Sequence, residues 1–584
     1  MRSKLCLIFL VPVIVFAGYQ SEVVTVEGAV PIDRIATKKV APPNNKPFTV
    51  TVGWVDTIGG TTYDWLANGP SYRWLVNSPA YGLHAGWMAS SEPGSPWSDR
   101  NMRYNFYDYG TGSWVWIDPD FMASGVGVFT IRSGYGNVDA DPVTGIAVFS
   151  AHQNPNQQWR PVLARDMAPG AGIFEYCDGA PNALHYLWPP ISIDANQVIH
   201  CALIDSFTRN TTFDIYYTKV ATWCNWETPI HIPPPQPDPS AQDQSIAASK
   251  VSQKVCITWV YSPSGYNDDP GFYRISNDGG ATWDAPRVLE DPPAYGQDTV
   301  PSFHIASLFP FFDSQDRLHI VAHVTPFVRD TNWILPAEIW HWCQNNNPQW
   351  SRIHRADAES LAAGVGYNAS LACRPSIGED NQGNLYVAWE EFDPLNADPV
   401  TSLLRANIYA AKSADGGNTW TSAKKLTDAG NASCRFPSIA DKMVETGEAI
   451  YVPIIYEIDQ QAGFVVQSQG TSTNNPVVVQ WVPADYFDGV AEQSKQGANR
   501  IELTAVPNPF TNRTLISYAL PKDGAVSINL YDITGRPVET LVQGHKSAGY
   551  HSVTLNSGQL PAGVYFCTLK AGGSSLTKRL TIVR

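Results

Sequence analysis

A repeated eight-residue motif limits the folds open to this chain more than any other feature. The segments "SNDGGATW" (276–283) and "SADGGNTW" (413–420) share the pattern S-x-D-x-G-x-T-W. A strand-like segment leads into each copy, and a more apolar segment precedes it, "KVCITWVYS" in one case and "LYVAWEEFD" in the other. Alternating polar and apolar residues are typical of half-buried strands. The chain therefore repeats one unit made of several short strands.

The same order of segments recurs, with a decayed motif, in five further places. The aromatic residues that end the seven units are Trp114, Phe174, Trp226, Trp283, Trp350, Trp420 and Trp481. They are spaced roughly 50 to 70 residues apart, which suits four short strands per unit. The pattern predicts an all-β fold, a β-propeller of seven blades over residues 47–485, with six blades as the alternative. The segment "PFTVTVGWVDTIGG" before the first unit is predicted to close the ring by pairing with the last blade.

The chemistry of the motif suits a tight corner between two strands. Asp278 can accept hydrogen bonds from the N–H groups that follow it, and Gly280 can adopt a positive φ. Thr282 can support the turn, and Trp283 can fill the gap between outer strands. The predicted corner residues are Ser276, Asp278, Gly280, Thr282 and Trp283, and in the second copy Ser413, Asp415, Gly417, Thr419 and Trp420.

This motif is similar to the Asp box of the sialidase-like and BNR-repeat propellers. The resemblance implies a structural corner at the outer edge of a blade, with the functional end of the blades opposite. Calcium binding at Asp278 or Asp415 is the alternative, but neither copy supplies the late Glu of a calcium loop. We therefore expect no metal and no cofactor.

The N-terminus has the features of a secretory signal peptide, assigned to residues 1–18. Arg2 and Lys4 precede an apolar run, and small residues follow it. A linker over 19–46 comes next. No later run of apolar residues is long enough for a membrane span after signal cleavage. The net charge is −15 and no basic stripe appears, which argues against nucleic acid as a partner.

Eight cysteines remain after signal cleavage, in an oxidising compartment where they can pair or stay as buried thiols. Cys373 in "CRPSI" and Cys434 in "CRFPSI" are predicted to occupy equivalent positions in neighbouring blades. They are the candidate disulfide.

After Trp481 the composition changes. Residues 486–500 form a polar linker, and residues 501–584 alternate in short runs separated by turn signals. This pattern predicts a small C-terminal Ig-like β-sandwich. The most distinctive segments of this domain are "PNPF", "LYDITGRPV", "LPAGVYF" and "KRLTIVR". The residues predicted to form a sorting signal, which we call the signal residues, are Pro507, Asn508, Pro509, Phe510, Gly535, Lys578 and Arg579.

This segment closely resembles the C-terminal sorting domain of cargo exported by the type IX secretion system of Bacteroidetes-related bacteria. The resemblance implies the type IX outer-membrane machinery as a partner. It also implies a protein that is secreted or attached to the outer-membrane surface. The alternative is an Ig-like stalk module that stays on the mature protein.

Two classes of function remain open for the propeller. The sialidase resemblance implies three arginines that grip a carboxylate, together with a Tyr–Glu pair and an Asp. The candidates for a central funnel are Arg374, Glu390, Arg435 and His323. Glu390 and Glu391 are adjacent on a strand and should point to opposite faces. We favour a non-catalytic surface protein that binds glycan or protein ligands, with a glycoside hydrolase of the sialidase-like group as the alternative. Burial of Arg374, Glu390 and Arg435 would argue against that enzyme.

Overall fold

The computed structural model describes residues 46–583, with gaps. The gaps are 68–71, 156–158, 180–184, 206–213, 233–240, 262–270, 290–291, 293–302, 329–330, 333, 448, 489–501, 507, 509, 511–512, 521, 523, 547–548 and 559. The expected signal peptide and nearly all of the linker 19–46 lie outside the described residues. The chain divides into two compact units, Met1–Asp488 and Gly489–Arg584, which we describe separately.

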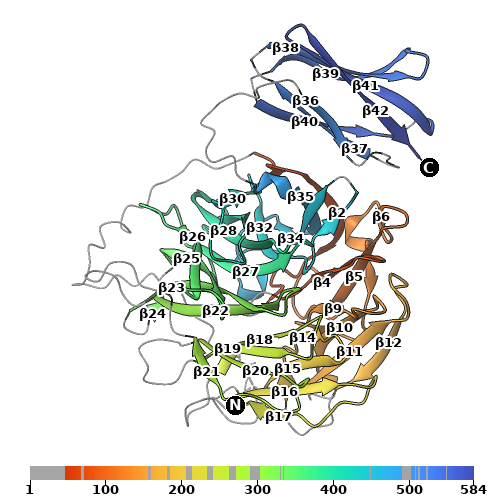
Figure 1. Ribbon diagram of the computed structural model, residues 1–584. Helices are drawn as coiled ribbons and strands as arrows, with labels where there is room; N and C mark the ends of the chain where they lie inside the picture. Colours follow the sequence, from red (N-terminus) through yellow and green to blue (C-terminus); the bar gives the residue numbers. More distant parts are fainter. Residues whose placement is uncertain are drawn as a thin grey trace, which may run out of the picture. The chain divides into compact units, whose positions relative to one another are not determined.

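The first unit is all-β and contains seven antiparallel sheets whose strands follow one another along the chain (Figure 1). Its helices among the described residues are single 3₁₀ turns, Phe121–Ala123, Val465–Gln467 and Ala484–Tyr486. Sheet 1 contains β3 (Leu75–Ser78), β4 (Gly82–Ala89), β5 (Asn101–Asp108), β6 (Ser113–Trp114) and β7 (Val126–Gly127). Sheet 2 contains β8 (Ser133–Gly134), β9 (Val138–Ala140), β10 (Ala147–Gln153), β11 (Arg160–Asp166) and β12 (Phe174–Asp178).

Sheets 3 to 5 repeat this order. Sheet 3 contains β13 (Tyr186–Leu187), β14 (Ile191–Ile193), β15 (Ile199–Asp205), β16 (Asp214–Val220) and β17 (Ile230–Ile232). Sheet 4 contains β18 (Ala241–Ala248), β19 (Val255–Tyr261), β20 (Gly271–Ser276) and β21 (Arg287–Leu289). Sheet 5 contains β22 (Phe303–Phe312), β23 (Leu318–Val328), β25 (Ala337–Cys343) and β26 (Trp350–Ala356), and β24 (Thr331–Asn332) pairs with β23.

The last two sheets complete the unit. Sheet 6 contains β27 (Ala372–Glu379), β28 (Leu385–Ala397), β29 (Leu404–Ser413) and β30 (Lys424–Lys425). Sheet 7 contains β32 (Ser433–Ile439), β34 (Ile450–Asp459), β35 (Asn475–Pro483) and β33 (Val444–Glu445). Its outermost strand is β2 (Trp54–Thr61), which comes from the N-terminal segment expected to close the ring. A short pair, β1 (Thr49–Val50) with β31 (Thr427–Asp428), lies beside it.

One strand from each sheet lies next to the corresponding strand of the following sheet, and these seven strands form a propeller-like ring around one axis. We call β3, β9, β14, β18, β22, β27 and β32 the inner strands. Polar side chains join neighbours among them: Ile191 N–H donates to Asn137 Oδ1 at 2.8 Å, and Ile439 N–H donates to Ser376 Oγ at 3.0 Å. Trp74 N–H donates to Ser438 Oγ at 3.0 Å, which joins the last sheet to the first. The ring is therefore closed both at its axis and at its outer edge.

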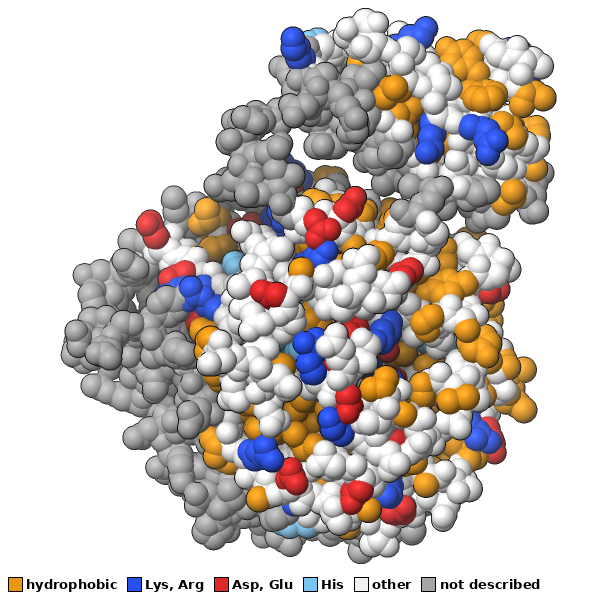
Figure 2. All heavy atoms as spheres, in the orientation of Figure 1, with side chains coloured by type: hydrophobic (Ala, Val, Ile, Leu, Met, Phe, Trp, Pro, Cys, Tyr) orange, Lys and Arg blue, Asp and Glu red, His pale blue; other side chains and the backbone are white. Residues whose placement is uncertain are grey.

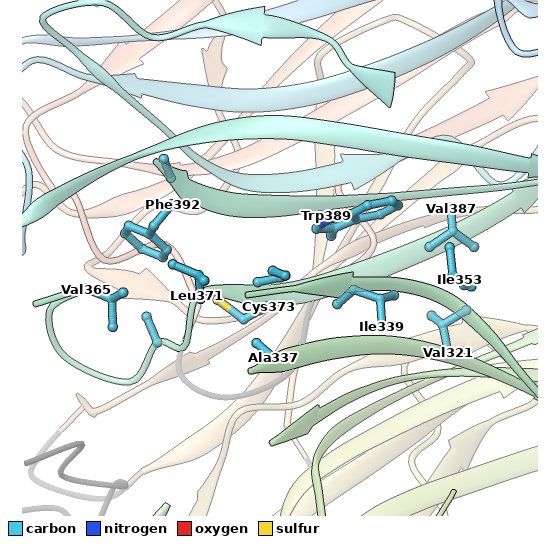
Figure 3. Close-up of a cluster of buried hydrophobic side chains, with 14 of the residues drawn as sticks. Val321, Ala337, Ile339, Ile353, Val365, Leu371, Cys373, Val387, Trp389 and Phe392 are labelled. Atoms are coloured by element: carbon cyan, nitrogen blue, oxygen red, sulfur yellow. The ribbon is translucent and has the colours of Figure 1, made fainter. Parts of the chain in front are cut away.

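Apolar side chains fill the space between consecutive sheets. Between sheets 5 and 6 (Figure 3), Val321, Ile339 and Ile353 face Val387 and Trp389, and all five are buried. Burying such side chains favours folding by about 1.5–3 kcal/mol each, because apolar surface is removed from water. A sheet in this ring therefore buries both of its faces against neighbouring sheets. For this reason its strands contain longer apolar runs than the strands of a sheet with one face exposed to solvent.

Both copies of the S-x-D-x-G-x-T-W motif form the same hydrogen-bonded corner. Asp278 accepts bonds from Thr282 N–H at 2.8 Å and Thr282 Oγ1 at 2.6 Å, and Ser276 Oγ accepts one from Gly280 N–H at 2.8 Å. Asp415 is bonded in the same way by Thr419. Trp283 packs edge-on against Tyr217 of sheet 3, with ring centres 4.8 Å apart. The motif aromatic therefore contacts the preceding sheet.

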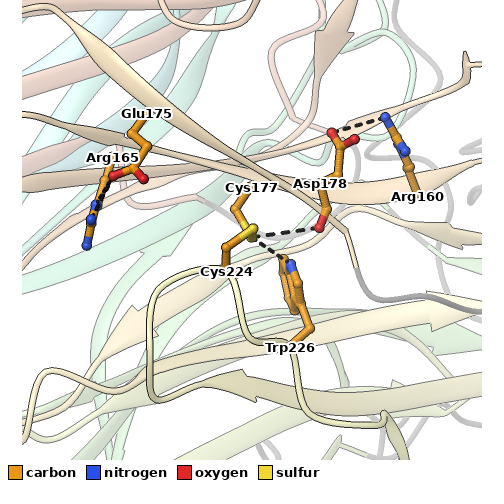
Figure 4. Close-up of a disulfide and its surroundings, with 7 residues drawn as sticks. All are labelled: Arg160, Arg165, Glu175, Cys177, Asp178, Cys224 and Trp226. Atoms are coloured by element: carbon orange, nitrogen blue, oxygen red, sulfur yellow. Dashed lines mark hydrogen bonds and ion pairs between the residues drawn. A yellow bond between two sulfur atoms is a disulfide. The ribbon is translucent and has the colours of Figure 1, made fainter.

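The cysteine pairing differs from the prediction. Cys373 and Cys434 are buried free thiols, and the disulfide joins Cys177 of β12 to Cys224 in the turn after β16 (Figure 4). Trp226 Nε1–H donates to the Cys177 sulfur at 3.1 Å, beside the bridge. The disulfide therefore links sheet 2 to sheet 3.

The predicted equivalence of Cys373 and Cys434 is wrong by one residue. Ser376 and Ser438 are equivalent, because the hydroxyl of each accepts a hydrogen bond from a backbone N–H of the next sheet in the ring, and we call them the latch serines. Counted from these serines, Cys373 corresponds to Arg435 and Arg374 to Phe436. Arg374 and Phe436 share a positive φ, 57° and 55°, at a bulge in their strands. A shift of one residue along a strand sends the side chain to the opposite face. Cys373 therefore packs between sheets 5 and 6, and Cys434 between sheets 6 and 7.

The second unit contains two antiparallel sheets that share one core. One sheet contains β36 (Glu502–Val506), β37 (Arg513–Leu520) and β40 (Gly549–Asn556). The other contains β39 (Pro537–Lys546), β38 (Gly524–Asp532), β41 (Gly563–Ala571) and β42 (Ser574–Ile582). Ile516 and Leu555 of the first sheet pack with Ile528 and Leu569 of the second. The unit is thus a small β-sandwich.

On the face of the first unit that Figure 2 shows, positive and negative side chains are intermixed. Large hydrophobic side chains are exposed on several of its sheets. Sheets 1 and 2 contribute several of them, including Ile117, Ile131, Met167, Ile173 and Tyr176. No helix formed by the described residues is long and apolar enough to cross a membrane.

Candidate functional site

Three of the four residues predicted to line a central funnel do meet, but in a buried cluster. Arg374 Nη1 lies 2.5 Å from Glu390 Oε1, and Arg435 Nη2 lies 3.3 Å from the same oxygen. Phe436 N–H donates to Glu390 Oε2 at 2.7 Å. Glu390 is 0%, Arg435 1% and Arg374 3% exposed. The prediction that these side chains are open to a ligand is therefore wrong.

Both arginines contact the same carboxylate, that of Glu390, and neither guanidinium is exposed to a substrate. Arg435 is surrounded by the rings of Phe392, Phe436 and Phe464. The two guanidinium groups hold the pKa of Glu390 low, at about 2, against the desolvation that raises it. This buried ion cluster, in which two guanidinium groups share one carboxylate, joins sheet 6 to sheet 7.

The other sequence candidates lie apart from this cluster. His323 of β23 is buried and its Nε2 lies 2.5 Å from Ser370 Oγ. Glu391 points away from Glu390 and pairs with His354, with Oε2 at 2.9 Å from Nε2. Adjacent residues on a strand alternate in direction, as expected.

Next to the ion cluster lie three further buried carboxyl groups, two on β34 and one in the segment that follows β2. We call Asp64, Glu457 and Asp459 the seam acids. Each uses one oxygen: Asp64 accepts from Val465 N–H, Glu457 from Asn475, and Asp459 from Gln461 N–H. Their other oxygens are buried without a hydrogen-bond partner in the structure. Burial raises the pKa of Asp64 to about 6 and raises the pKa values of Glu457 and Asp459 well above the usual range.

A tyrosine pair that the sequence did not point to lies near the starts of the inner strands of sheets 1 and 2. Tyr63 and Tyr135 share a hydrogen bond of 2.5 Å between their hydroxyl oxygens, and Arg100 donates to the Tyr63 hydroxyl at 3.2 Å. The Arg100 guanidinium lies over both rings. Burial lowers the pKa of the adjacent His152 well below its usual value, so the imidazole is neutral. Residues 206–213, 262–270 and 293–302 lie outside the described residues.

Arg73 bridges four sheets around the axis of the ring. Its Nη1 donates to Ile439 O and its Nη2 to Ile377 O, both at 2.8 Å. The guanidinium also lies 5.0 Å from the ring centre of Phe309 and 5.7 Å from that of Phe311. A cavity of about 140 Å³ continues from this point along the inner strands, lined by Asp139, Lys250 and Asp441 among others.

A second hollow, larger than this cavity, lies at the ends of the inner strands. We call this hollow of about 650 Å³ the axial cavity. Its wall comes from the turns that follow inner strands of several sheets and includes Asn77, Tyr81, Asp141, Asn381, Asp441 and Glu445. Lys250, Ser314, Asp441 and Lys442 line both cavities. The hollow lies at the same end of the strands as the motif corners, whereas the sequence predicted a site at the opposite end.

Tyr81 is the aromatic residue of this wall. Its side chain is 41% exposed. Gly145 lies beneath the ring with a φ of 68°, and a Cβ there would lie 2.3 Å from the Tyr81 ring. Asn77 supports the same wall, since its N–H donates to Asp441 Oδ1 at 2.9 Å and its Oδ1 accepts from the Tyr109 hydroxyl at 2.7 Å. An exposed ring beside fixed polar groups is an arrangement that can hold a polar ligand.

The described residues contain no group of three or more His, Cys, Asp or Glu side chains suited to a metal ion. At the motif corners both carboxylate oxygens of Asp278 accept bonds from Thr282, and those contacts hold its pKa at about 2. The corner carboxylates thus act in the turn itself.

In the sandwich, the signal residues lie along the last strand. Asn508 Nδ2 donates to Arg579 O at 2.8 Å, and Thr581 N–H donates to Asn508 Oδ1 at 2.8 Å. Phe510 is buried and exchanges backbone bonds with Thr581 and Val583. Gly535 has a φ of 81° in the turn after β38, and Lys578 and Arg579 lie on β42. Pro507 and Pro509 lie outside the described residues.

Residues 504–583 match the family described as the secretion system C-terminal sorting domain. This match confirms the resemblance seen in the sequence. The chain is therefore cargo of the type IX secretion machinery, and it is secreted or held at the outer-membrane surface. No curated protein matches the chain.

Several solved structures are similar to the first unit at low identity. An ulvan lyase, a polysaccharide lyase bound to GlcA(1-4)Rha3S, is 12% identical with a TM-score of 0.40, over 73% of this chain and 96% of its own. The polysaccharide lyase Uly1 is 10% identical with a TM-score of 0.41, over 76% and 100%. The Penicillium chrysogenum α-L-arabinanase complexed with arabinobiose is 12% identical with a TM-score of 0.37, over 62% and 98%. Likeness this distant carries no argument about the chemistry of this chain.

Proposed function

We propose that the first unit is a non-catalytic binding module, exported by its sorting domain, that holds a glycan in the axial cavity. The observation that carries the proposal is the exposed Tyr81 ring in the wall of a 650 Å³ hollow. Aromatic rings stack on the apolar faces of sugars, while amide and carboxylate groups accept their hydroxyl protons. The cavity offers both kinds of group.

The burial of the predicted funnel residues supports binding over the sialidase-like chemistry considered for this chain. A sialidase-like site would need free arginines at its surface, whereas Arg374 and Arg435 are paired with Glu390 away from solvent. Replacing Glu390 would leave two buried guanidinium groups without their shared carboxylate, which costs about 3–5 kcal/mol. The cluster therefore supports the ring rather than a reaction.

A second candidate is a carbohydrate-active enzyme. The class of enzyme that the sequence resemblance implies is a glycoside hydrolase of the sialidase-like group. The observation in its favour is the Tyr63–Tyr135 pair with Arg100 and the neutral His152. Tyrosine and histidine are side-chain types that enzymes use as general acids and bases.

One experiment separates the two candidates. The mature chain is applied to a glycan array and, in parallel, to a panel of fluorogenic glycosides and polysaccharides. Binding that Tyr81→Ala weakens at least tenfold, while Tyr176→Ala does not, supports the axial cavity. Tyr176 is a matched control because it is 44% exposed and lies on β12, away from the cavity wall. Turnover that Tyr135→Phe abolishes supports the enzyme and overturns the binding proposal.

The finer architecture is also inferred. The seven sheets in chain order support a seven-bladed propeller closed by β2. The repeated corner supports kinship with Asp-box propellers, and the two-sheet core supports an Ig-like sandwich. A structure with six or eight such sheets, or with a different strand order in the sandwich, would refute these assignments.

A further inference from the structure

The charge of the axial cavity indicates which glycans it can take. This inference rests on the proposed function and names its ligand class. The two connected hollows are lined by seven acidic side chains and three basic ones, Arg73, Lys250 and Lys442. The whole chain is also acidic, with a net charge of −15. A negative field of this kind repels sulfated and uronate-containing polysaccharides and attracts cations.

The two lysines add little to the field available to a ligand because each is paired within the wall. Lys250 Nζ lies 2.8 Å from Asp139 Oδ2 and also donates to Ala140 O. Lys442 pairs with Glu379. Arg73 is held by the carbonyl oxygens of Ile377 and Ile439. Each basic group of the described wall therefore already has a partner within the protein, which weakens its attraction for an anionic sugar.

Most of the wall's carboxylates are occupied as well. Both oxygens of Glu445 accept from Asn381, and Asp141 accepts from Val143 N–H and Gln197. Asp380 accepts from Asn384 and Tyr386. These groups shape the wall, and a ligand cannot approach them without competing with short bonds.

Asp441 differs from them. Its Oδ1 accepts from Asn77 N–H at 2.9 Å, which orients the carboxylate, and Oδ2 has no hydrogen-bond partner among the described residues. Asp441 lines both the inner and the outer hollow. Tyr81 lines the outer one. An oriented carboxylate with one free oxygen can accept a charge-assisted hydrogen bond.

We propose that the axial cavity binds a saccharide that carries free, protonated amino groups, with Asp441 Oδ2 as the acceptor for an ammonium and Tyr81 as the stacking surface. A glucosamine unit has this chemistry: its ring has an apolar face for the tyrosine, and its ammonium is a donor for the carboxylate. Acetylation removes the charge and leaves the ring unchanged, which makes the acetylated sugar a matched competitor.

Calorimetric titration of the mature chain with a glucosamine oligosaccharide and its N-acetylated counterpart of equal length tests the proposal. The measurement is made at slightly acidic pH, where the amines are protonated. The amine form should bind about tenfold more tightly, the size of one charge-assisted hydrogen bond in partial contact with solvent. Added salt should reduce the difference, because it screens the charge pair.

Asp441→Asn should abolish the preference, because the amide retains the Oδ1 acceptor for Asn77 and loses the charge. Asp284→Asn is the control: it removes one negative charge at a part-exposed position of sheet 4, outside the cavity wall, and should keep the preference. Equal binding of the two oligosaccharides, or a preference that survives Asp441→Asn, overturns the inference and leaves glycan binding intact. If neither oligosaccharide binds and the glycan array is also empty, the proposed function fails, and the inference fails with it.

Discussion

At the scale of single residues, burial decides what the charged side chains of this protein do. Arg374, Glu390 and Arg435 are of the right chemical types for a sugar-processing site, but they pair with one another out of contact with water. Asp441 stands in no motif of the sequence, yet it lines two cavities, and its Oδ2 has no hydrogen-bond partner among the described residues. Residue type alone could not separate these two situations.

The seam acids give the protein a pH-dependent stability. A carboxyl group whose pKa is raised on folding holds its proton more tightly in the folded chain. This contribution is complete below the unfolded pKa, near 4, and is lost as the pH rises through the folded pKa. For Asp64 that window runs from the unfolded value to about 6, and for Glu457 it extends higher.

We predict that Glu457→Gln flattens this dependence, because the amide cannot ionise. The free energy of unfolding of the native chain, measured by urea titration, should fall as the pH rises from about 4 through the folded pKa of Asp64, about 6, and beyond it, and that of the variant should fall less. Glu391→Gln is the control, because it replaces a half-buried carboxylate on a different strand, where Glu391 pairs with His354. Parallel profiles for Glu457→Gln and the native chain would contradict the prediction.

At the scale of the element, the two adjacent glycines of the first motif corner have different roles. Gly279 and Gly280 both have positive φ, 67° and 79°. A Cβ at Gly280 would lie 1.8 Å from the Tyr217 hydroxyl, whereas a Cβ at Gly279 would have no atom nearer than 3.6 Å. The first glycine is needed for its backbone, and the second also for its closeness to the neighbouring sheet.

Gly280→Ala should therefore destabilise the first unit more than Gly279→Ala. Both substitutions carry the cost of positive φ, about 1 kcal/mol, and only Gly280→Ala forces Tyr217 to move, which adds about 1–3 kcal/mol. Chemical denaturation of the two variants measures the difference. Equal destabilisation would show that Tyr217 gives way without cost.

The PNPF segment has a related role in the sandwich. Asn508 and Phe510 bond to Arg579, Thr581 and Val583, so they lie along β42 as a neighbouring strand would. Unpaired strand edges invite association with other chains, and a covered edge avoids it. This explains in physical terms why an Asn and a Phe stand at these positions.

At the scale of the whole molecule, the ring is held by a disulfide as well as by its strands. Cys177 and Cys224 are 47 residues apart in the chain and join sheets 2 and 3 (Figure 4). Closing a loop of this length stabilises a fold by up to about 4 kcal/mol, chiefly through the unfolded chain.

We predict that Cys177→Ser with Cys224→Ser lowers the midpoint of thermal unfolding, and that a reducing agent does the same to the native chain. The reducing agent should have no effect on the double variant, because the other cysteines in the described residues are free thiols. A reductant effect that persists in the double variant would contradict this pairing.

The two units should have separable roles: the first should fold without the sorting domain, and export should require the sorting domain. A chain that ends at Asp488 retains all seven sheets and loses the sorting domain. We expect it to fold, as judged by circular dichroism and resistance to protease, and to stay inside the outer membrane of an expressing strain. Fractionation of cells and medium, with the full chain as control, measures this. Appearance of the truncated protein in the medium would contradict the role of the sorting domain.

The sequence by itself determined what depends on local pattern. Alternation and turn residues predicted strands, the repeat predicted successive sheets with β2 closing the last, and short fixed motifs identified the corners and the sorting domain. These signals survive because each acts over a few neighbouring residues. The latch serines were also visible in the sequence: aligning on Ser376 and Ser438, rather than on the cysteines, would have placed Cys373 and Cys434 correctly.

Only the tertiary structure decided exposure and partners. A one-residue bulge determines which face Cys434 and Arg435 occupy, and the sequence pattern does not record it. The Cys177–Cys224 pair and the axial cavity each bring together residues from different sheets, and the seam acids join residues about 400 positions apart in the sequence. Whether a carboxylate is paired, protonated or free depends on those distant neighbours, and the distances between them exist only once the ring has closed.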